Sequence, residues 1–174
     1  SAIEMHFGLL KREIARAGAA TGETPAIQEI EQQLGHLRRL LTSFLDYSRK
    51  VRPQREKVVL HDFLQRILES RRQVLGDFVF TLEISENLTG FFDPAMLQQV
   101  IENLVNNAFQ AAAEGGLHLT VRAVTDGSLL RLQVADNGPG VPAAIAEQLF
   151  TPFVSGSAGG NGFGLAISRK LVEA

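Results

Sequence analysis

The stretch Asp93–Ala108, DPAMLQQVIENLVNNA, decides how we interpret the second half of the chain. Asp93 can accept hydrogen bonds from the free amide groups that begin a helix, and Pro94 stands where no amide donor is needed. The glycine pair Gly115-Gly116 is typical of a helix end. We therefore expect a long helix from residue 94 to about residue 113.

Two asparagines on this helix, Asn103 and Asn107, are four residues apart and therefore share one face. Their neighbours Val100, Leu104 and Ala108 are apolar, so we expect this face to lie against a sheet. A neutral amide oxygen beside phosphate oxygens is a suitable ligand for Mg²⁺, which takes oxygen ligands. The alternative is that the two asparagines are ordinary surface residues. The pattern taken alone favours this alternative over a magnesium site.

Strands and further helices are expected on both sides of the long helix. Alternating apolar and polar residues predict strands at 58–60, 78–84, 91–92, 117–123 and 130–134, the last two joined by an Asp126-Gly127 turn. Helical patterns cover residues 62–75, 143–150 and 162–174. Helices thus alternate with what we interpret as an antiparallel sheet, and the fold class is α+β.

A glycine-rich stretch, Asp136-Asn-Gly-Pro-Gly140, follows the last predicted strand. The carboxylate of Asp136 could accept a hydrogen bond from an exocyclic amine such as that of adenine. Glycine at positions 138 and 140 allows the backbone to approach a flat ring closely. A plain turn is the alternative, favoured when this pattern stands alone, because all of these residues are common in turns.

A second glycine-rich stretch, Gly159–Leu165, lies directly before the last predicted helix. Free amide groups and the positive end of the helix dipole bind phosphate at such a position. The stretch is not a dinucleotide fingerprint, because no buried strand precedes it in a strand-helix-strand unit, nor does it end in Gly-Lys-Ser/Thr. A flexible linker is an equally good interpretation of this stretch alone.

The first 55 residues predict two helices joined by a short turn. Apolar residues recur at spacings of three and four over Ile3–Ala17 and again over Ile27–Val51. Pro25 suits the first position of the second helix, and Pro53 marks its end. A single hairpin buries this seam poorly, so we expect two chains to pair in a four-helix bundle. A hairpin packed on its own neighbouring domain is the alternative.

Taken in order along the chain, these patterns resemble the sensor histidine kinases. That family belongs to the ATPase superfamily of the ninety-kilodalton heat-shock chaperone, type II topoisomerases and mismatch-repair ATPases. Asn103–Ala108 resembles the family's asparagine box, and Asp136–Gly140 and Gly160–Leu165 resemble its two glycine boxes. Leu149–Phe153 resembles the phenylalanine box, and Leu45–Arg49 the end of the second dimerisation helix. The nitrogen-regulation branch is the most similar.

The resemblance implies a dimerisation hairpin over residues 1–55 and an α/β-sandwich ATP-binding kinase domain over residues 56–174. The start of the first helix and the C-terminal strands of the domain are then expected outside this sequence. The implied function is transfer of the terminal phosphate of Mg·ATP to a histidine upstream of Ser1, and from there to the receiver domain of a response regulator.

Site residues follow from the matching positions of the family. Asn107 would be the Mg²⁺ ligand, and Asp136 would hold adenine. Asn103 would be the catalytic position, where hydrolysing relatives keep a glutamate; an amide cannot act as a general base, which favours transfer to a protein side chain. The other implied nucleotide-site residues are Gly138, Gly140, Phe150, Phe153, Gly160, Gly162, Gly164 and Leu165, and the two phenylalanines are expected mainly to pack.

Two features depart from the family pattern. Ser157 stands where near relatives often have a lysine, and none of the four histidines lies in the acceptor context, since His6 is followed by Phe7 and Gly8. These departures leave open a degenerate module that binds nucleotide or regulator without kinase activity. A serine-type anti-sigma kinase of the same superfamily is a further alternative.

Composition excludes several other classes. A formal net charge of -2 argues against nucleic-acid binding, and the absence of cysteine excludes disulfides and thiolate metal sites. No apolar run approaches the length of a membrane span. We expect a cytoplasmic segment whose parent protein could be anchored in a membrane through parts outside it.

Overall fold

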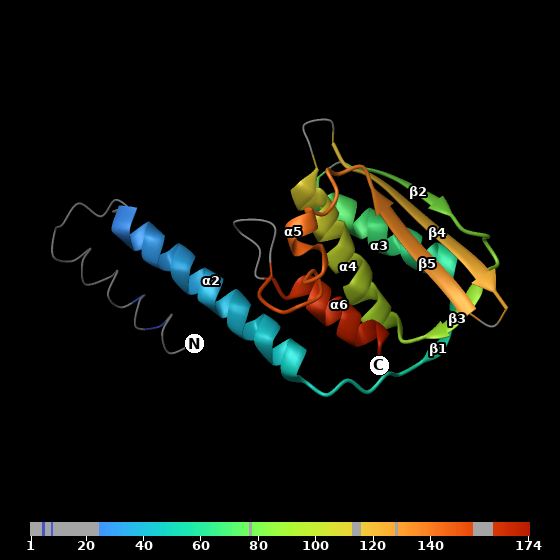
Figure 1. Cartoon of the computed structure of the whole chain (residues 1–174), viewed down its shortest axis with the longest axis horizontal. Helices are drawn as coiled ribbons and strands as arrows, with labels where there is room; N and C mark the ends of the chain where they lie inside the picture. Colours follow the sequence, from blue (N-terminus) through green and yellow to red (C-terminus); the bar gives the residue numbers. More distant parts are fainter. Residues whose placement is uncertain are drawn as a thin grey trace. The chain divides into compact units, whose positions relative to one another are not determined.

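The computed structural model describes residues 5, 8, 25–76, 78–112, 116–127, 129–154 and 162–174 (Figure 1). The chain divides into two compact units, Ser1–Thr42 and Ser43–Ala174. The first predicted helix lies outside the described residues except for Met5 and Gly8, which are both helical. Among the described residues, no helix is both long and apolar enough to cross a membrane.

Helix α2 spans Pro25–Ser48 and begins at the predicted proline. The prediction that its seam continues to Val51 was wrong, because the helix ends three residues earlier. In a longer helix the carbonyl of Tyr47 would accept from the amide of Val51. Here the Lys170 ammonium group donates to that carbonyl instead, and Pro53 favours an extended chain before it.

The second unit holds the remaining elements. They are β1 (Glu56–Val59), α3 (Leu60–Leu75), β2 (Val79–Glu83), β3 (Thr89–Phe92), α4 (Pro94–Ala111), β4 (His118–Asp126), β5 (Leu129–Asp136), α5 (Ala143–Ala146) and α6 (Gly164–Val172). The α+β class is confirmed.

The main sheet has the strand order β2-β4-β5, and β1 pairs separately with β3. Strands β4 and β5 form the predicted antiparallel hairpin, in which Asp126 lies opposite Leu129. The expectation of a wholly antiparallel sheet was wrong, because β2 runs parallel to β4, with Val79 opposite His118. The chain between these strands passes through α4, and a helical crossover is what joins parallel neighbours.

Helices α3, α4 and α6 lie on one face of this sheet, as Figure 1 shows. Almost fully buried apolar side chains fill the space between the layers: Leu60, Leu64 and Leu68 of α3, Ile101 and Val105 of α4, and Leu119 and Val121 of β4. Helix α4 contacts both α3 and α6. Helix α4 therefore has a neighbouring helix on two sides.

The start of α4 is capped as predicted. The Asp93 carboxylate accepts from the amide of Met96 at 3.1 Å and from the amide of Gln54 at 2.6 Å. These bonds favour the charged form, so the hydrogen bond from Gln54, followed by that from Met96, lowers the pKa of Asp93 below its usual value. Asp93 thus begins the helix and also holds the segment before β1.

Two predicted helices are shorter in the structure. Helix α5 ends at Ala146 instead of residue 150, and α6 begins at Gly164 instead of residue 162. Beyond α5 the backbone bonds link residues three apart, with the Gln148 amide bonded to the Ile145 carbonyl at 3.0 Å. Such bonds form isolated turns, which do not extend an α-helix.

Candidate functional site

Asn103 joins α4 to the first turn of α6. Its side-chain amide donates to the carbonyl of Gly164 at 3.1 Å and to the Ser168 hydroxyl at 3.2 Å. The buried Ser168 hydroxyl in turn donates to the same carbonyl at 2.9 Å. The predicted asparagine helix and the predicted glycine-rich helix start are therefore held together by hydrogen bonds.

The expectation that the asparagine face of α4 lies against the sheet was wrong. The side chains that α4 buries are Val100, Ile101, Val105 and Ala108. Asn103 points instead toward α6, and Asn107, one turn later, is exposed. The cause is that α6 packs beside α4, so the polar face of α4 meets another helix.

Asn106, the third asparagine of α4, contacts α3 and not α6. The Arg71 guanidinium on α3 donates from Nη2 to Oδ1 of Asn106 at 2.5 Å. This charge-assisted bond ties α3 to α4 directly beside Asn107. The sequence analysis did not single out Arg71, because a lone arginine on a helix has no spacing that would identify it.

Asp136 ends β5 and organises the loop that follows. Its Oδ1 accepts from the amide of Gly138 at 2.8 Å. A Cβ atom at position 138 would lie 2.7 Å from that oxygen and 3.7 Å from Cβ of Ala111, so a larger residue here would displace the Asp136 carboxylate. Gly140 has φ +77°, a conformation that favours glycine. The loop therefore reaches the C-terminal end of α4.

Asn137 holds this loop in place from the other side. Its Oδ1 accepts from the amide of His118 at 2.9 Å, and its Nδ2 donates to the carbonyl of Gly116 at 3.1 Å. The sequence analysis treated Asn137 only as a turn former. The side-chain amide of Asn137 thus bonds one backbone amide and one backbone carbonyl, as the backbone of a neighbouring strand would. The residue therefore has a specific structural role.

The phenylalanine and second glycine patterns also meet. The Phe153 amide donates to the carbonyl of Gly162 at 3.1 Å. Gly162 has φ +67°, and a Cβ atom there would lie 2.5 Å from the carbonyl carbon of Phe153. The Phe153 ring stands edge-on to the buried Phe163 ring at 4.7 Å. Gly160 lies outside the described residues, so its placement stays a prediction.

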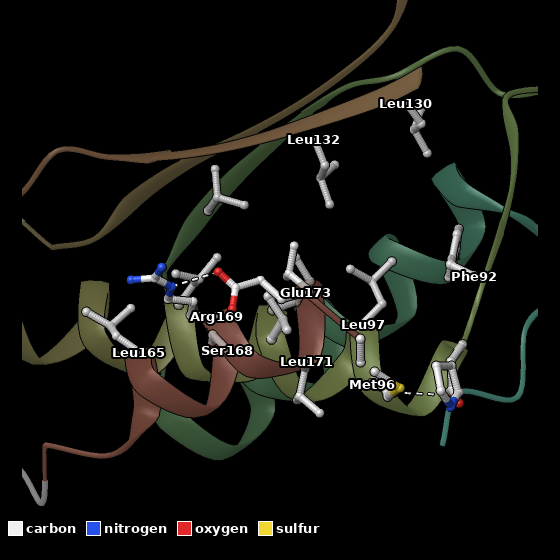
Figure 2. A pocket seen from close by; sticks show the side chains of 18 of the residues that line it. Phe92, Met96, Leu97, Leu130, Leu132, Leu165, Ser168, Arg169, Leu171 and Glu173 are labelled. Atoms are coloured by element: carbon white, nitrogen blue, oxygen red, sulfur yellow. Dashed lines mark hydrogen bonds and ion pairs between the residues drawn. The ribbon is translucent and has the colours of Figure 1, made fainter. Parts of the chain in front are cut away.

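Phe150 and Leu165 face an apolar groove. They line this groove between β5, α4 and α6, together with Leu130, Leu132 and Val134 of the strand (Figure 2). An ion pair of 2.8 Å between Arg169 of α6 and Glu173, the residue directly after this helix, also lines the groove. Neither Asn107 nor Asp136 lines this groove, so Phe150 and Leu165 face a different surface from these two predicted site residues.

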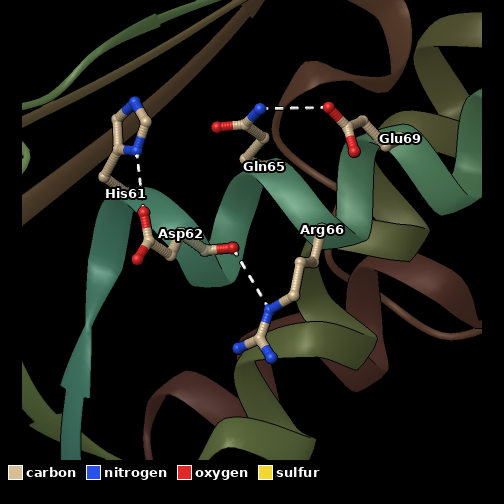
Figure 3. Close-up of polar contacts among 5 residues, drawn as sticks. All are labelled: His61, Asp62, Gln65, Arg66 and Glu69. Carbon is tan, nitrogen blue, oxygen red and sulfur yellow. Dashed lines mark hydrogen bonds and ion pairs between the residues drawn. The ribbon is translucent and has the colours of Figure 1, made fainter.

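The polar side chains of α3 contact one another only along the helix. His61 lies 3.2 Å from the Asp62 carboxylate, Arg66 donates to the Asp62 carbonyl at 3.3 Å, and Gln65 donates to Glu69 at 3.0 Å. Figure 3 shows these contacts along the helix. These contacts join neighbouring residues on the side of α3 that faces away from the core. Within the described residues, no group of three or more histidine, aspartate or glutamate side chains is arranged to hold a metal ion.

The model of the histidine kinase-, DNA gyrase B- and HSP90-like ATPase family matches residues 92–174. That range contains Asn103, Asp136, Phe153 and Gly164, the residues whose surroundings are described above. The chain carries a histidine kinase ATPase domain. The predicted family is confirmed.

Relatives with the same domain are sensor kinases. The chain is 41% identical over 91 residues to the sensory histidine kinase/phosphatase NtrB of Klebsiella oxytoca, covering 47% of this chain and 26% of that protein. It is 32% identical over 152 residues to the sensor protein kinase PilS of Pseudomonas aeruginosa, covering 84% and 29%. The chain thus spans between a quarter and a third of the length of these relatives.

Solved histidine kinase structures share the arrangement of the ATPase domain. The catalytic domain of histidine kinase ThkA is 27% identical with a TM-score of 0.58, over 69% of this chain and 80% of that domain. A ThkA structure in complex with the response regulator TrrA, 23% identical, matches 99% of this chain and 52% of that chain with a TM-score of 0.67. The second match shows that the likeness in fold extends over nearly the whole chain.

Proposed function

We propose that this chain is the catalytic core of a two-component sensor histidine kinase, which transfers the terminal phosphate of Mg·ATP to a histidine. The proposal rests mainly on the bond from Asn103 to the carbonyl of Gly164. This bond brings the asparagine helix to the glycine-rich start of α6 inside a histidine kinase ATPase domain. The domain would extend from residue 56, after the dimerisation segment.

ATP would bind between these two elements and the Asp136 loop. The free Oδ2 edge of the Asp136 carboxylate would accept from the amino group of adenine, while Oδ1 stays on the Gly138 amide. Gly138 and Gly140 would let the backbone approach the ring. The amide groups at the start of α6, from Gly162 to Gly164, together with Gly160, would face the phosphates, where the helix dipole favours negative charge.

Mg²⁺ would be held by the exposed oxygen of Asn107 and by phosphate oxygens, and the ion would neutralise charge on the transferred phosphoryl group. Asn103 already uses its amide hydrogens on Gly164 and Ser168. Whatever its hydrogen bonds, a neutral carboxamide is not basic enough to take a proton from water at neutral pH. The arrangement therefore supports transfer to a protein side chain over hydrolysis of ATP.

The remaining predicted site residues would act through packing. Phe153 supports the Gly162 carbonyl and the Phe163 ring. Phe150 and Leu165 face the apolar groove. We propose that further strands of the same domain cover this groove, since the alternating side chains Leu130, Leu132 and Val134 present an apolar face to it.

The partners would be a second copy of the chain and the receiver domain of a response regulator. Helix α2 supports the first, because its seam residues Ile30, Leu37, Leu41 and Phe44 are about half exposed. The second is supported by the ThkA structure, which contains a response regulator. The reaction would take place in the cytoplasm, where ATP is available, whether or not other parts of the protein reach a membrane.

Replacing Asn107 by alanine should remove the gain in nucleotide affinity that Mg²⁺ brings. Loss of one ion ligand should weaken magnesium-supported binding by about tenfold, with little change in magnesium-free binding. The measurement is a titration of a fluorescent ATP analogue in Mg²⁺ and in chelator. Gln98→Ala on the same helix, which removes only an exposed bond to Glu102, serves as the control and should bind as the unaltered chain does. An unchanged magnesium effect in Asn107→Ala would remove Asn107 from the proposal.

A further inference from the structure

The two stretches of sequence that form the proposed nucleotide site contain no lysine or arginine. Residues 73–121 and 132–168 lack both residue types, and every residue that we assign to the nucleotide lies in one of these stretches. ATP carries its negative charge on the phosphates, and one Mg²⁺ ion neutralises only part of that charge. Proteins that transfer phosphoryl groups commonly add a positive side chain to the metal. Such a side chain has to come from another part of this chain.

Arg71 of α3 brings a positive charge to α4 beside this site. Its guanidinium donates from Nη2 to Oδ1 of Asn106 at 2.5 Å. Asn106 directly precedes Asn107, the proposed Mg²⁺ ligand, and is three residues after Asn103. Residues three apart on a helix surface have Cβ atoms about 5–6 Å apart. Arg71 therefore reaches α4 within one turn of both of these asparagines.

The level of Arg71 along α4 matches the phosphates and not the base. A Cβ atom at position 138, in the proposed adenine loop, would lie 3.7 Å from Cβ of Ala111 near the end of the helix. With a rise of 1.5 Å per residue, Asn106 is about 7.5 Å along the axis from Ala111 and about 1.5 Å from Asn107. A Mg²⁺ ion at Asn107 would bridge the β- and γ-phosphates. Arg71 thus lies at the level of these two groups.

The charge of Arg71 is not neutralised by its partner. The acceptor is the uncharged carboxamide of Asn106, and the ion pairs within the described part of the chain do not include Arg71. A guanidinium has five N–H donors in a planar fork that fits phosphate oxygens. The bond to Asn106 occupies one of these donors. The positive charge and the other donors therefore remain for an anionic ligand.

A purely structural role, in which Arg71 only ties α3 to α4, is the alternative. The Nε atom of Arg71 is buried and has no hydrogen-bond acceptor among the described residues. The cost of a buried donor without an acceptor is about as large as the gain from one charge-assisted bond. The bond to Asn106 thus contributes little net stability, and an apolar side chain would fill the same space without this cost. The contact therefore favours a role for the charge itself.

We propose that Arg71 binds the β- and γ-phosphates of the nucleotide from the α3 side of α4. The inference rests on the proposed function and adds a phosphate-binding residue to it. Asn106 holds the guanidinium beside Asn107, and the phosphate oxygens accept from the remaining donors. The amide groups from Gly162 to Gly164 meet the phosphates from α6. Arg71 thereby supplies the positive side chain that the other residues of the site lack.

Competition of ATP and adenosine against a fluorescent ATP analogue, with Mg²⁺ present, tests this role. Arg71→Met keeps most of the apolar stem and removes the charge and the donors. Because hydrogen bonds to a charged group are lost, ATP should bind about tenfold more weakly. Adenosine has no phosphate and should bind as it does to the unaltered chain. Arg71→Lys keeps a charge without the planar fork, so its affinity for ATP should be intermediate.

Arg72→Met is the matched control. It removes the same charge from the adjacent residue of α3, whose guanidinium carbon lies 5.6 Å from the centre of the Phe80 ring. Its affinity for ATP should equal that of the unaltered chain. An equal loss in Arg72→Met and Arg71→Met would show an effect of net charge alone and would overturn the inference.

Two other results would also overturn it. One is an affinity for ATP in Arg71→Met equal to that of the unaltered chain, which would leave the proposed function standing. The other is loss of adenosine binding together with ATP binding in both Arg71→Met and Arg71→Lys, which would show that Arg71 only supports the fold. If the unaltered chain binds no ATP, the proposed function fails and this inference fails with it.

Discussion

Asp136→Asn is expected to lower the affinity for ATP by about ten- to hundredfold, which corresponds to the loss of a charge-assisted bond of about 1.5–3 kcal/mol. Asparagine has the shape of aspartate, and its oxygen can keep the bond that Asp136 makes to the Gly138 amide at 2.8 Å. Its other terminal group is then an NH₂, which faces the amino group of adenine as donor against donor. The loss of affinity therefore reports recognition of the base and not collapse of the loop.

The same substitution should change which base is preferred. A purine with a carbonyl in place of the amino group accepts a hydrogen bond from the new NH₂. Competition of ATP and ITP against a fluorescent nucleotide should show preference for ATP in the unaltered chain and loss or reversal of that preference in Asp136→Asn. Asp126→Ala, at the opposite end of the same hairpin, removes an exposed carboxylate and should leave both affinities unchanged. Equal ATP affinity in Asp136→Asn would contradict the assignment of the adenine position.

Leu37→Asp is expected to convert a dimer into monomers. Leu37 is 49% exposed in the single chain, and its neighbours along the seam, Leu41 and Phe44, are 53% and 48% exposed. Pairing of two such seams would bury each leucine, so an aspartate would place a carboxylate in an apolar interface. The cost is several kcal/mol in each chain unless the group becomes protonated, and both chains of the dimer contribute.

Light scattering at a series of protein concentrations measures this effect. Gln32→Asp introduces the same charge on an exposed, non-seam position of the same helix and should leave the dimer intact. A mass of one chain for the unaltered protein at high micromolar concentration would reject dimerisation through α2. An intact dimer in Leu37→Asp would place the interface on a different surface.

Local chemistry predicted the elements that position the site. Asp93 and Pro94 marked the start of α4, and Asp126-Gly127 marked the hairpin turn, because these residues act through bonds to their immediate neighbours. Gly138 was predicted to allow close approach of a flat ring, and Gly162 was predicted as part of the second glycine box. At these two positions a Cβ atom would lie 2.7 Å and 2.5 Å from neighbouring atoms of the protein. Such positions depend little on the rest of the fold.

Features that depend on distant pairing were not predictable in the same way. Alternation shows that 79–83 is a strand, but it does not show that its neighbour is the parallel β4. Helical spacing shows that Asn103 and Asn107 share a face, but not that this face meets α6. Lys170 resembles any surface lysine in the sequence, and its role follows only from the approach of Tyr47 and Arg49.

The central claim, that this chain is the ATP-dependent core of a histidine kinase, is tested most directly by following the terminal phosphate. The chain as given and a protein extended upstream and downstream are incubated with terminally radiolabelled ATP and Mg²⁺. Positioning of the nucleophile supplies most of the rate of phosphoryl transfer, and none of the histidines of this chain lies in the acceptor context of the family. We predict label only on the extended protein, lost in acid as expected of a phosphohistidine, and abolished by Asn107→Asp. Acid-stable label on a hydroxyl side chain, or label on His6 of the chain as given, would contradict this account.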